Sequence, residues 1–225
     1  TIRKQVLDLI AEVQGEPLVD EALLDEVNYL VEAPSALRGT FDEEHLSLPE
    51  AVLTSVMKKH QRYFPVRSAQ NGYLLPYFIT IRNGNREFSE VVIDGNELVI
   101  KARFADAAFF IDEDLKHKLE DLLPRLGTLT FQLKLGSMLD KAQRIEKLVE
   151  RLAPVFKLSE SEKQTALRAA HLCKADLVSH MVVEMTSVQG AMGRYYALAS
   201  GESKEVAEAI YEHYLPRYTG DAMPA

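Results

Sequence analysis

The chain has 225 residues, of which 47% are hydrophobic and 27% are charged, and its formal net charge is -8. This composition is typical of a soluble globular protein with enough residues for one large domain or two small ones. It excludes a disordered chain and a uniformly basic nucleic-acid coat.

No apolar run approaches the roughly 20 residues that span a bilayer, so we expect no membrane partner. The single cysteine, Cys173, excludes an internal disulfide framework and favours the reducing cytoplasm. A start at Thr1 rather than at methionine suggests an excised piece of a longer protein.

Charge is distributed unevenly along the chain. Residues 1–57 hold 3 basic and 12 acidic side chains, a net charge of -9, whereas residues 58–103 hold 8 basic and 4 acidic ones, a net charge of +4. The middle stretch is therefore a basic island in an acidic chain, able to attract phosphate if it is exposed. The alternative is an ordinary solvated surface of mixed charge.

The first half of the chain predicts helices followed by a hairpin. Apolar spacing predicts helices over 2–13 and 20–31, with a turn near residues 15–17 and with Asp20 as the N-cap of the second helix. Pro34 ends that helix, and Ser47 is expected to cap another that runs to about residue 60. The Asn71-Gly72 turn, flanked by strands near 63–66 and 73–81, predicts a β-hairpin. A long apolar helix is expected over 90–111.

After about residue 112 every pattern is helical. Ser137 and Ser159 each begin a capping box, with Asp140 and Glu162 as the returning carboxylates. A stripe of apolar residues then predicts a helix ended by Pro154. Further helices are expected over 160–184, 187–199 and 203–214. We therefore predict a predominantly helical α+β protein: a small mixed module with a β-hairpin over 1–130, then at least the first part of an all-helical module over 131–225.

The sequence holds no recognisable catalytic constellation. It has no P-loop, no dinucleotide-binding glycine motif and no nucleophile elbow. Its six histidines form no metal-binding pair of the H-E-x-x-H kind, and Cys173 reads as a buried structural thiol. We therefore expect no catalytic residue and no metal ligand.

One segment resembles the metal centre of the helical HD phosphohydrolase superfamily, in which adjacent His and Asp ligands lie on a helix. Here His171 is followed by Lys174-Ala175-Asp176 where that dyad would lie. A protonated lysine and an alanine cannot bind a divalent cation. His171 and Asp176 are thus interpreted as degenerate HD-like positions in a helical scaffold, with a metal-dependent phosphohydrolase as the remote alternative.

Several collinear stretches together resemble one family, the β subunit of the bacterial-type heterotetrameric glycyl-tRNA synthetase. They cover nearly the whole chain in order: 24–27, 31–34, 57–65, 75–79, 95–97, 101–110, 134–141, 174–177, 189–197 and 213–218. The resemblance implies an aminoacyl-tRNA synthetase, a ligase of protein biosynthesis that uses ATP and Mg²⁺. It also implies that the α subunit carries the ATP and glycine chemistry and that the β subunit supplies tRNA contacts. This chain is similar to an internal piece with no cofactor of its own, and its partners would be the α subunit and tRNA(Gly).

Two roles for such a piece follow. In the first, basic and aromatic residues form a face that follows tRNA phosphates. The candidates are Lys58, Lys59, His60, Arg62, Tyr63, Arg82, Asn83, Lys101, Arg103 and Arg194. In the second, the chain is a docking module for the α subunit without direct tRNA contact, through acidic residues 1–57 or the apolar helix over 90–111.

Overall fold

The structure is a computed structural model that describes residues 1–16 and 19–225. The chain divides into two compact units, Thr1–Ala108 and Phe109–Ala225. The boundary lies inside one long helix, whereas the boundary expected from the sequence, at residue 130, lies within the second unit. None of the described helices combines the length and the apolar composition that crossing a bilayer requires.

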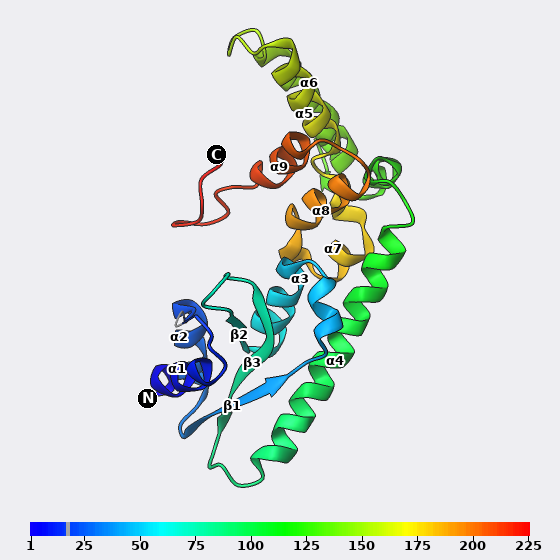
Figure 1. The fold of residues 1–225 in the computed structure, drawn as a ribbon. Helices are drawn as coiled ribbons and strands as arrows, with labels where there is room; N and C mark the ends of the chain where they lie inside the picture. Colours follow the sequence, from blue (N-terminus) through cyan, green and yellow to red (C-terminus); the bar gives the residue numbers. More distant parts are fainter. Residues whose placement is uncertain (17–18) are drawn as a thin grey trace. The chain divides into compact units, whose positions relative to one another are not determined.

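The first unit is built around a three-stranded antiparallel sheet with the strand order β1-β3-β2. The sheet lies between the pair α1–α2 and the pair α3–α4 (Figure 1). A short 3-10 helix, Glu43–Ser47, precedes α3, which continues as a π-helical turn over Val56–His60. The elements are α1 (Ile2–Glu12), α2 (Glu21–Leu30), β1 (Pro34–Thr40), α3 (Glu50–Ser55), β2 (Phe64–Arg67), β3 (Leu74–Asn83) and α4 (Ser89–Asp114).

Alternation along β3 divides the core of this unit into two layers. Ile79 belongs to the cluster formed with the apolar faces of α1 and α2. Its neighbour Phe78 points to the opposite face, where its ring stacks on Tyr63 with centroids 4.6 Å apart. Phe104 of α4 is fully buried and meets the edge of Phe41. The basic island, residues 58–103, begins in the π-helical turn after α3, includes β2 and β3, and ends within α4. The sheet therefore positions its side chains.

Most predictions for this unit are confirmed. Asp20 caps α2 by accepting a hydrogen bond from the backbone N of Leu23 at 3.0 Å. The β2–β3 hairpin pairs Phe64 with Ile79, and the long apolar helix runs over Ser89–Asp114. In the turn expected near 15–17, Gly15 forms an isolated bridge with Ser68, and Pro17 lies outside the described residues.

Two features of this unit correct the predictions. Strand β1 was not expected, because its seven residues pair with β3, between 37 positions (Thr40 with Tyr77) and 49 positions (Pro34 with Asn83) further along the chain. Ser47 does not cap α3: its hydroxyl donates to the carbonyl of Glu44 instead, and the position before α3 is Pro49.

The second unit is predominantly helical. Helices α5 and α6 form an antiparallel hairpin, and α6 also packs against α9 (Figure 1). Three 3-10 helices, Leu119–Thr128, Ala175–Val178 and Thr186–Val188, connect the longer elements. The remaining elements are β4 (Thr130–Gln132), β5 (Gly136–Ser137), α5 (Met138–Leu152), α6 (Glu160–Leu172), α7 (His180–Glu184), α8 (Ala191–Ala199) and α9 (Lys204–Glu212).

Both capping boxes of this unit are confirmed, with reciprocal hydrogen bonds at Ser137–Asp140 and Ser159–Glu162. The prediction that every element after residue 112 is helical was wrong, because β4 and β5 form a small hairpin. The prediction of one helix over 160–184 was also wrong. Helix α6 ends at Leu172, and the Ser179 hydroxyl caps a new helix by accepting a hydrogen bond from the backbone N of Val182 at 3.3 Å. Serine is found both at N-caps and on the exposed faces of helices. The apolar spacing therefore does not show that Ser179 begins a new helix.

Candidate nucleic-acid interface

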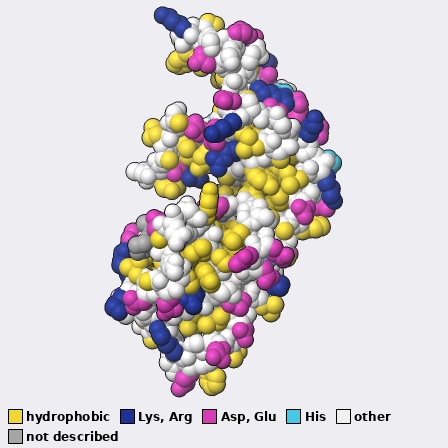
Figure 2. Space-filling model, viewed as in Figure 1, with side chains coloured by type: hydrophobic (Ala, Val, Ile, Leu, Met, Phe, Trp, Pro, Cys, Tyr) yellow, Lys and Arg dark blue, Asp and Glu magenta, His cyan; other side chains and the backbone are white. Residues whose placement is uncertain are grey.

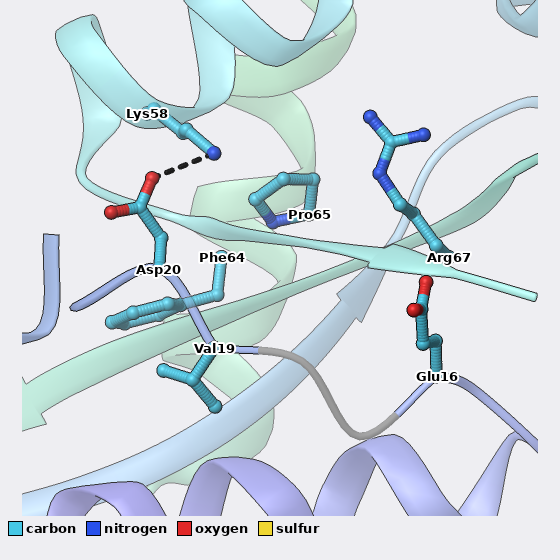
Figure 3. A pocket seen from close by; sticks show the side chains of 7 residues that line it. All are labelled: Glu16, Val19, Asp20, Lys58, Phe64, Pro65 and Arg67. Atoms are coloured by element: carbon cyan, nitrogen blue, oxygen red, sulfur yellow. Dashed lines mark hydrogen bonds and ion pairs between the residues drawn. The ribbon is translucent and has the colours of Figure 1, made fainter. Parts of the chain in front are cut away.

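Two cations of the basic island, Lys58 and Arg67, line one cavity of the first unit. Lys58, at the end of α3, reaches Asp20 with its Nζ 2.7 Å from Oδ2, across a cavity of about 310 Å³ (Figure 3). Burial acts to raise the pKa of Asp20, but hydrogen bonds from Lys58 and from the Leu23 amide outweigh it and lower the pKa. Arg67 on the same cavity pairs with Glu50. The cations here are engaged by carboxylates, so the cavity itself carries little net charge.

Two other cations of the island are also paired. The Nε of Arg62 lies 2.7 Å from Oε1 of Glu26, and the Nζ of Lys101 lies 2.9 Å from Oδ2 of Asp42. The hydrogen bond from Lys101 lowers the pKa of the Asp42 carboxyl. Such exposed pairs contribute little stability, because solvent screens them. A phosphate could therefore displace the carboxylates, at the cost of breaking each pair.

The remaining candidates of the island fall into two groups. Lys59, His60 and Arg103 are exposed, and in the described part of the chain no hydrogen bond or ion pair engages their side chains. Asn83 is the last residue of β3, and its side-chain oxygen accepts hydrogen bonds from the backbone N of Glu32 and of Ala33. It therefore links the end of β3 to the segment just before β1.

Tyr63 is placed in the core rather than on the surface. Its ring stacks on Phe78, and its hydroxyl donates to Oδ1 of Asn96 at 2.8 Å. Burial raises the pKa of the Tyr63 hydroxyl to about 12. The ring consequently leaves no free face on which a base could stack.

Two arginines among the candidates are also engaged. The Arg82 guanidinium donates to the carbonyl of Glu87 at 2.5 Å. In the second unit, Arg194 lies 3.2 Å from Glu208 and over the ring of Tyr211. Both side chains therefore serve local packing in the structure as it stands.

Residues 171–176, whose sequence was compared above with HD phosphohydrolases, contribute the buried side chains Lys174 and Asp176 to a polar cluster in the second unit. The Nζ of Lys174 lies 2.6 Å from Nε2 of His213 and over the ring of Tyr214. Burial lowers the pKa of Lys174 and, together with the nearby lysine charge, lowers the pKa of His213 to about 4. The Tyr214 hydroxyl is buried without a partner. These contacts hold the end of α6 against the end of α9.

Asp176 belongs to the same cluster. Its Oδ2 accepts a hydrogen bond from the backbone N of Gly190 at 2.6 Å, and its Oδ1 is buried without a partner. Burial raises the pKa of this carboxyl to about 6. His171 has other partners, since its Nδ1 lies 3.2 Å from Glu146.

The donor set expected of a metal centre is not assembled from these residues. A hydrolase would require Asp176 together with His171 or His180. His180 instead pairs through Nδ1 with Asp114 at 2.8 Å. Among the residues that the structure describes, the three side chains whose ligand atoms come within 4.8 Å of one another are Asp42, Glu44 and His45, in the first unit.

Sequence reasoning missed one buried carboxylate that organises the second unit. Asp114, at the end of α4, accepts hydrogen bonds from the backbone N of His180 and of Met181, from the His180 ring and from the hydroxyl of Tyr196. A signal was present: an aspartate in phase with the buried residues Ala107 and Ile111 is unusual unless it has partners.

Comparison with known proteins supplies the family. The profile described as "Glycyl-tRNA synthetase beta subunit" matches residues 1–225. Among similar curated proteins, all named glycine–tRNA ligase beta subunit, that of Trichodesmium erythraeum is 50% identical over 99% of this chain, and that of Halothermothrix orenii is 49% identical over 99%. That of Shouchella clausii is 52% identical over 92%. This chain covers 32%, 32% and 30% of those three relatives, about a third of their length.

These proteins are subunits of aminoacyl-tRNA synthetases, by their names. The chain belongs to the glycyl-tRNA synthetase beta subunit family.

Proposed function

We propose that this chain is a segment of the β subunit of a heterotetrameric glycine–tRNA ligase that contributes tRNA binding and scaffolding. The observation that carries the proposal is the family match over all 225 residues. The α subunit would perform the chemistry with ATP, Mg²⁺ and glycine, in the cytoplasm. The role of this segment would be to hold tRNA and to keep neighbouring parts of the β subunit in place.

Within the basic island, the exposed and unpaired cations are the side chains best suited to phosphate. Lys59, His60 and Arg103 would bind without breaking an existing ion pair, whereas Lys58, Arg62 and Lys101 would each have to exchange a carboxylate for a phosphate. Binding of this kind carries no sequence information by itself. Identity of the tRNA would be read elsewhere in the enzyme.

The second unit would serve as a scaffold derived from an HD-like fold. Its support is chemical: Lys174 stands where a ligand is expected, and its ammonium is engaged by His213 and Tyr214. The buried Asp176 accepts from the Gly190 amide. In this proposal the polar cluster replaces a metal centre with hydrogen bonds that join α6, α8 and α9.

The test is equilibrium binding of the chain to a tRNA with a glycine anticodon and to a non-cognate tRNA, across a salt series. We expect an affinity that falls as salt rises, because cations on the protein release counterions from the RNA. The variant Lys59→Ala/Arg103→Ala should bind more weakly than wild type. The matched control is Lys4→Ala/Lys116→Ala, which removes two cations already paired with Asp8 and Glu113. Absence of binding at low salt would remove tRNA contact from the proposal.

A docking role for the α subunit is the second candidate, and exposed apolar side chains on α4 favour it. Val91 is 69% exposed and Leu98 is 70% exposed, although the opposite side of the same helix buries Ile100 and Phe104. A helix that is apolar on two sides is usually covered on both. Sedimentation of the chain with the α subunit, compared between wild type and Leu98→Asp, tests this role. Unchanged co-sedimentation of the variant would argue against docking through α4.

A further inference from the structure

Helix α5 carries a row of cations on its exposed side. Arg144, Lys147 and Arg151 are separated by three and four residues, the spacing that places side chains on one face of a helix. All three side chains are exposed, and with Leu148 they line an open hollow of about 240 Å³. The row lies opposite the side of α5 that buries Ala142 against the rest of the unit.

Among the described residues no carboxylate forms an ion pair with this row, although the charge of Arg144 helps to lower the pKa of Asp140, one helical turn earlier. Ion pairs and hydrogen bonds engage none of the three side chains there, in contrast to Lys58, Arg62 and Lys101. The row is therefore a local positive site in a chain whose formal net charge is -8.

The carboxylates of α5 are directed elsewhere. Asp140 accepts hydrogen bonds from the backbone N and the hydroxyl of Ser137, both at 2.7 Å, as part of the capping box. Glu146 lies 3.2 Å from the ring of His171 on α6. In the described part of the chain no ion pair is formed by Glu150 either. The spare positive charge is consequently available to an external anion.

The length of the row fits a run of phosphates. Seven residues separate Arg144 from Arg151, which corresponds to about 10 Å along the helix axis. Successive phosphates of one strand of B-form DNA advance by about 3.4 Å along the duplex axis, and a row of this length can likewise reach a few phosphates of one RNA strand. Guanidinium groups at both ends can each bind a phosphate through two N–H donors.

We propose that the α5 basic row, Arg144, Lys147 and Arg151, binds the phosphodiester backbone of RNA. The inference rests on the proposed tRNA-binding function and gives it a location that charge along the sequence does not indicate. Because the contacts are to phosphates, the row contributes equally to cognate and non-cognate tRNA. Lys141 is not counted in the row, since its Nζ lies 3.9 Å above the ring of Phe131.

The test compares Arg144→Ala/Lys147→Ala/Arg151→Ala with wild type in titrations of fluorescently labelled tRNA between 50 and roughly 200 mM salt. The slope of log affinity against log salt should decrease by about 2 to 3, and affinity at the lowest salt should fall by about 10- to 100-fold. The loss should be the same for tRNA with a glycine anticodon and for a non-cognate tRNA. Circular dichroism checks that α5 remains folded, as expected because alanine favours helix at exposed positions.

The matched control is Arg3→Ala/Lys4→Ala/Arg38→Ala. It changes the net charge by the same amount but removes cations that pair with Glu21, Asp8 and Glu12. We expect it to bind within about twofold of wild type. Arg144→Lys/Arg151→Lys should have an affinity between those of wild type and the α5 alanine variant, because it keeps both charges but loses the paired N–H donors.

Three outcomes decide the matter. A loss confined to the α5 variant supports the row as a phosphate site. If wild type binds but the α5 variant behaves like the control, the inference is wrong while the proposed function stands. If wild type fails to bind any tRNA at 50 mM salt, the row is refuted as a phosphate site and tRNA contact is removed from the proposed function, which then retains scaffolding alone.

Discussion

The Nζ of Lys174 lies 2.6 Å from Nε2 of His213, and Nδ1 of the same imidazole lies 2.7 Å from the carbonyl oxygen of Ile210. A carbonyl oxygen only accepts, so Nδ1 carries the proton and Nε2 accepts from the lysine. The ring is therefore neutral, and protonating it would place two cations in contact within a buried cluster. This relationship makes the second unit sensitive to acid.

We predict that His213 contributes a loss of stability at acidic pH. Its pKa falls from an ordinary 6.5 to about 4 in the folded chain. A depressed pKa means that stability is complete above about pH 6.5 and is lost as pH falls toward about 4. Because His213 is exposed, solvent screening limits the loss to about 1 kcal/mol. The measurement is urea unfolding of wild type and of His213→Gln at pH 7 and pH 4.5. The unfolding free energy of wild type should fall more between the two pH values than that of His213→Gln. The exposed His117→Gln is the control, and an equal response in both variants would contradict the prediction.

Asp176 is predicted to act in the opposite direction. Burial raises its pKa from 3.8 to about 6, against the hydrogen bond from the Gly190 amide. A raised pKa means that stability is complete below about pH 3.8 and is lost as pH rises through about 6. Relative to wild type, Asp176→Asn should therefore gain up to about 3 kcal/mol between pH 4 and pH 7.5. Unfolding curves at those two pH values provide the measurement, and a pH-independent difference would show that the carboxyl is ionised with an ordinary pKa.

Replacing Asp114 tests the buried carboxylate that joins α4 to α7 and α8. Asp114→Asn keeps the shape but places an amide group against donors from His180, Met181 and Tyr196. We expect a loss of about 2–4 kcal/mol, because bonds to a charged acceptor are lost and a buried donor is left unpaired. The control is Asp112→Asn, two residues earlier on the exposed side of α4. Its unfolding free energy should stay within about 0.5 kcal/mol of wild type. Similar values for both variants would contradict a special role for Asp114.

Two glycines should respond in opposite directions to alanine. At Gly39 in β1 an added Cβ would lie 2.3 Å from Cζ of Phe78, a fully buried ring stacked on Tyr63. Overpacking of this kind costs about 1–3 kcal/mol or more. At Gly95, in the middle of α4, a Cβ meets no atom within 4 Å. Gly95→Ala should stabilise the chain by about 0.5–1 kcal/mol, because alanine is the better helix former. Thermal unfolding of the two variants provides the check, and a destabilised Gly95→Ala would show that this position is covered.

Some of the fold was predictable because its signals are local. Asp20, Ser137 and Ser159 cap helices whose first turns follow directly, so a few adjacent residues carry the information. The Asn71-Gly72 turn likewise defines its own hairpin. Strand β1 and the break after Leu172 were missed because their partners lie far along the chain, at β3 and at Gly190.

The candidate site shows the same division. A count of charges found the basic island, but Lys58 and Arg62 find their carboxylates 38 and 36 residues away, through folding alone. The charge count did not identify the α5 row. Residues 104–225 hold 15 basic and 18 acidic side chains, and their net charge does not show that one face of a helix is basic. Tyr63 was expected beside a phosphate and instead stacks on Phe78 in the core.

By itself the sequence determined the family, the predominantly helical α+β class and the absence of recognised catalytic motifs, because these depend on residue identity and local spacing. Only the tertiary structure decided which cations are neutralised, since an ion pair requires two side chains to meet within about 4 Å. It likewise decided that Asp176 is buried, which raises its pKa, and that Arg144, Lys147 and Arg151 remain unpaired. The sequence determines which side chains are charged, but the fold determines which of those charges are available to a ligand.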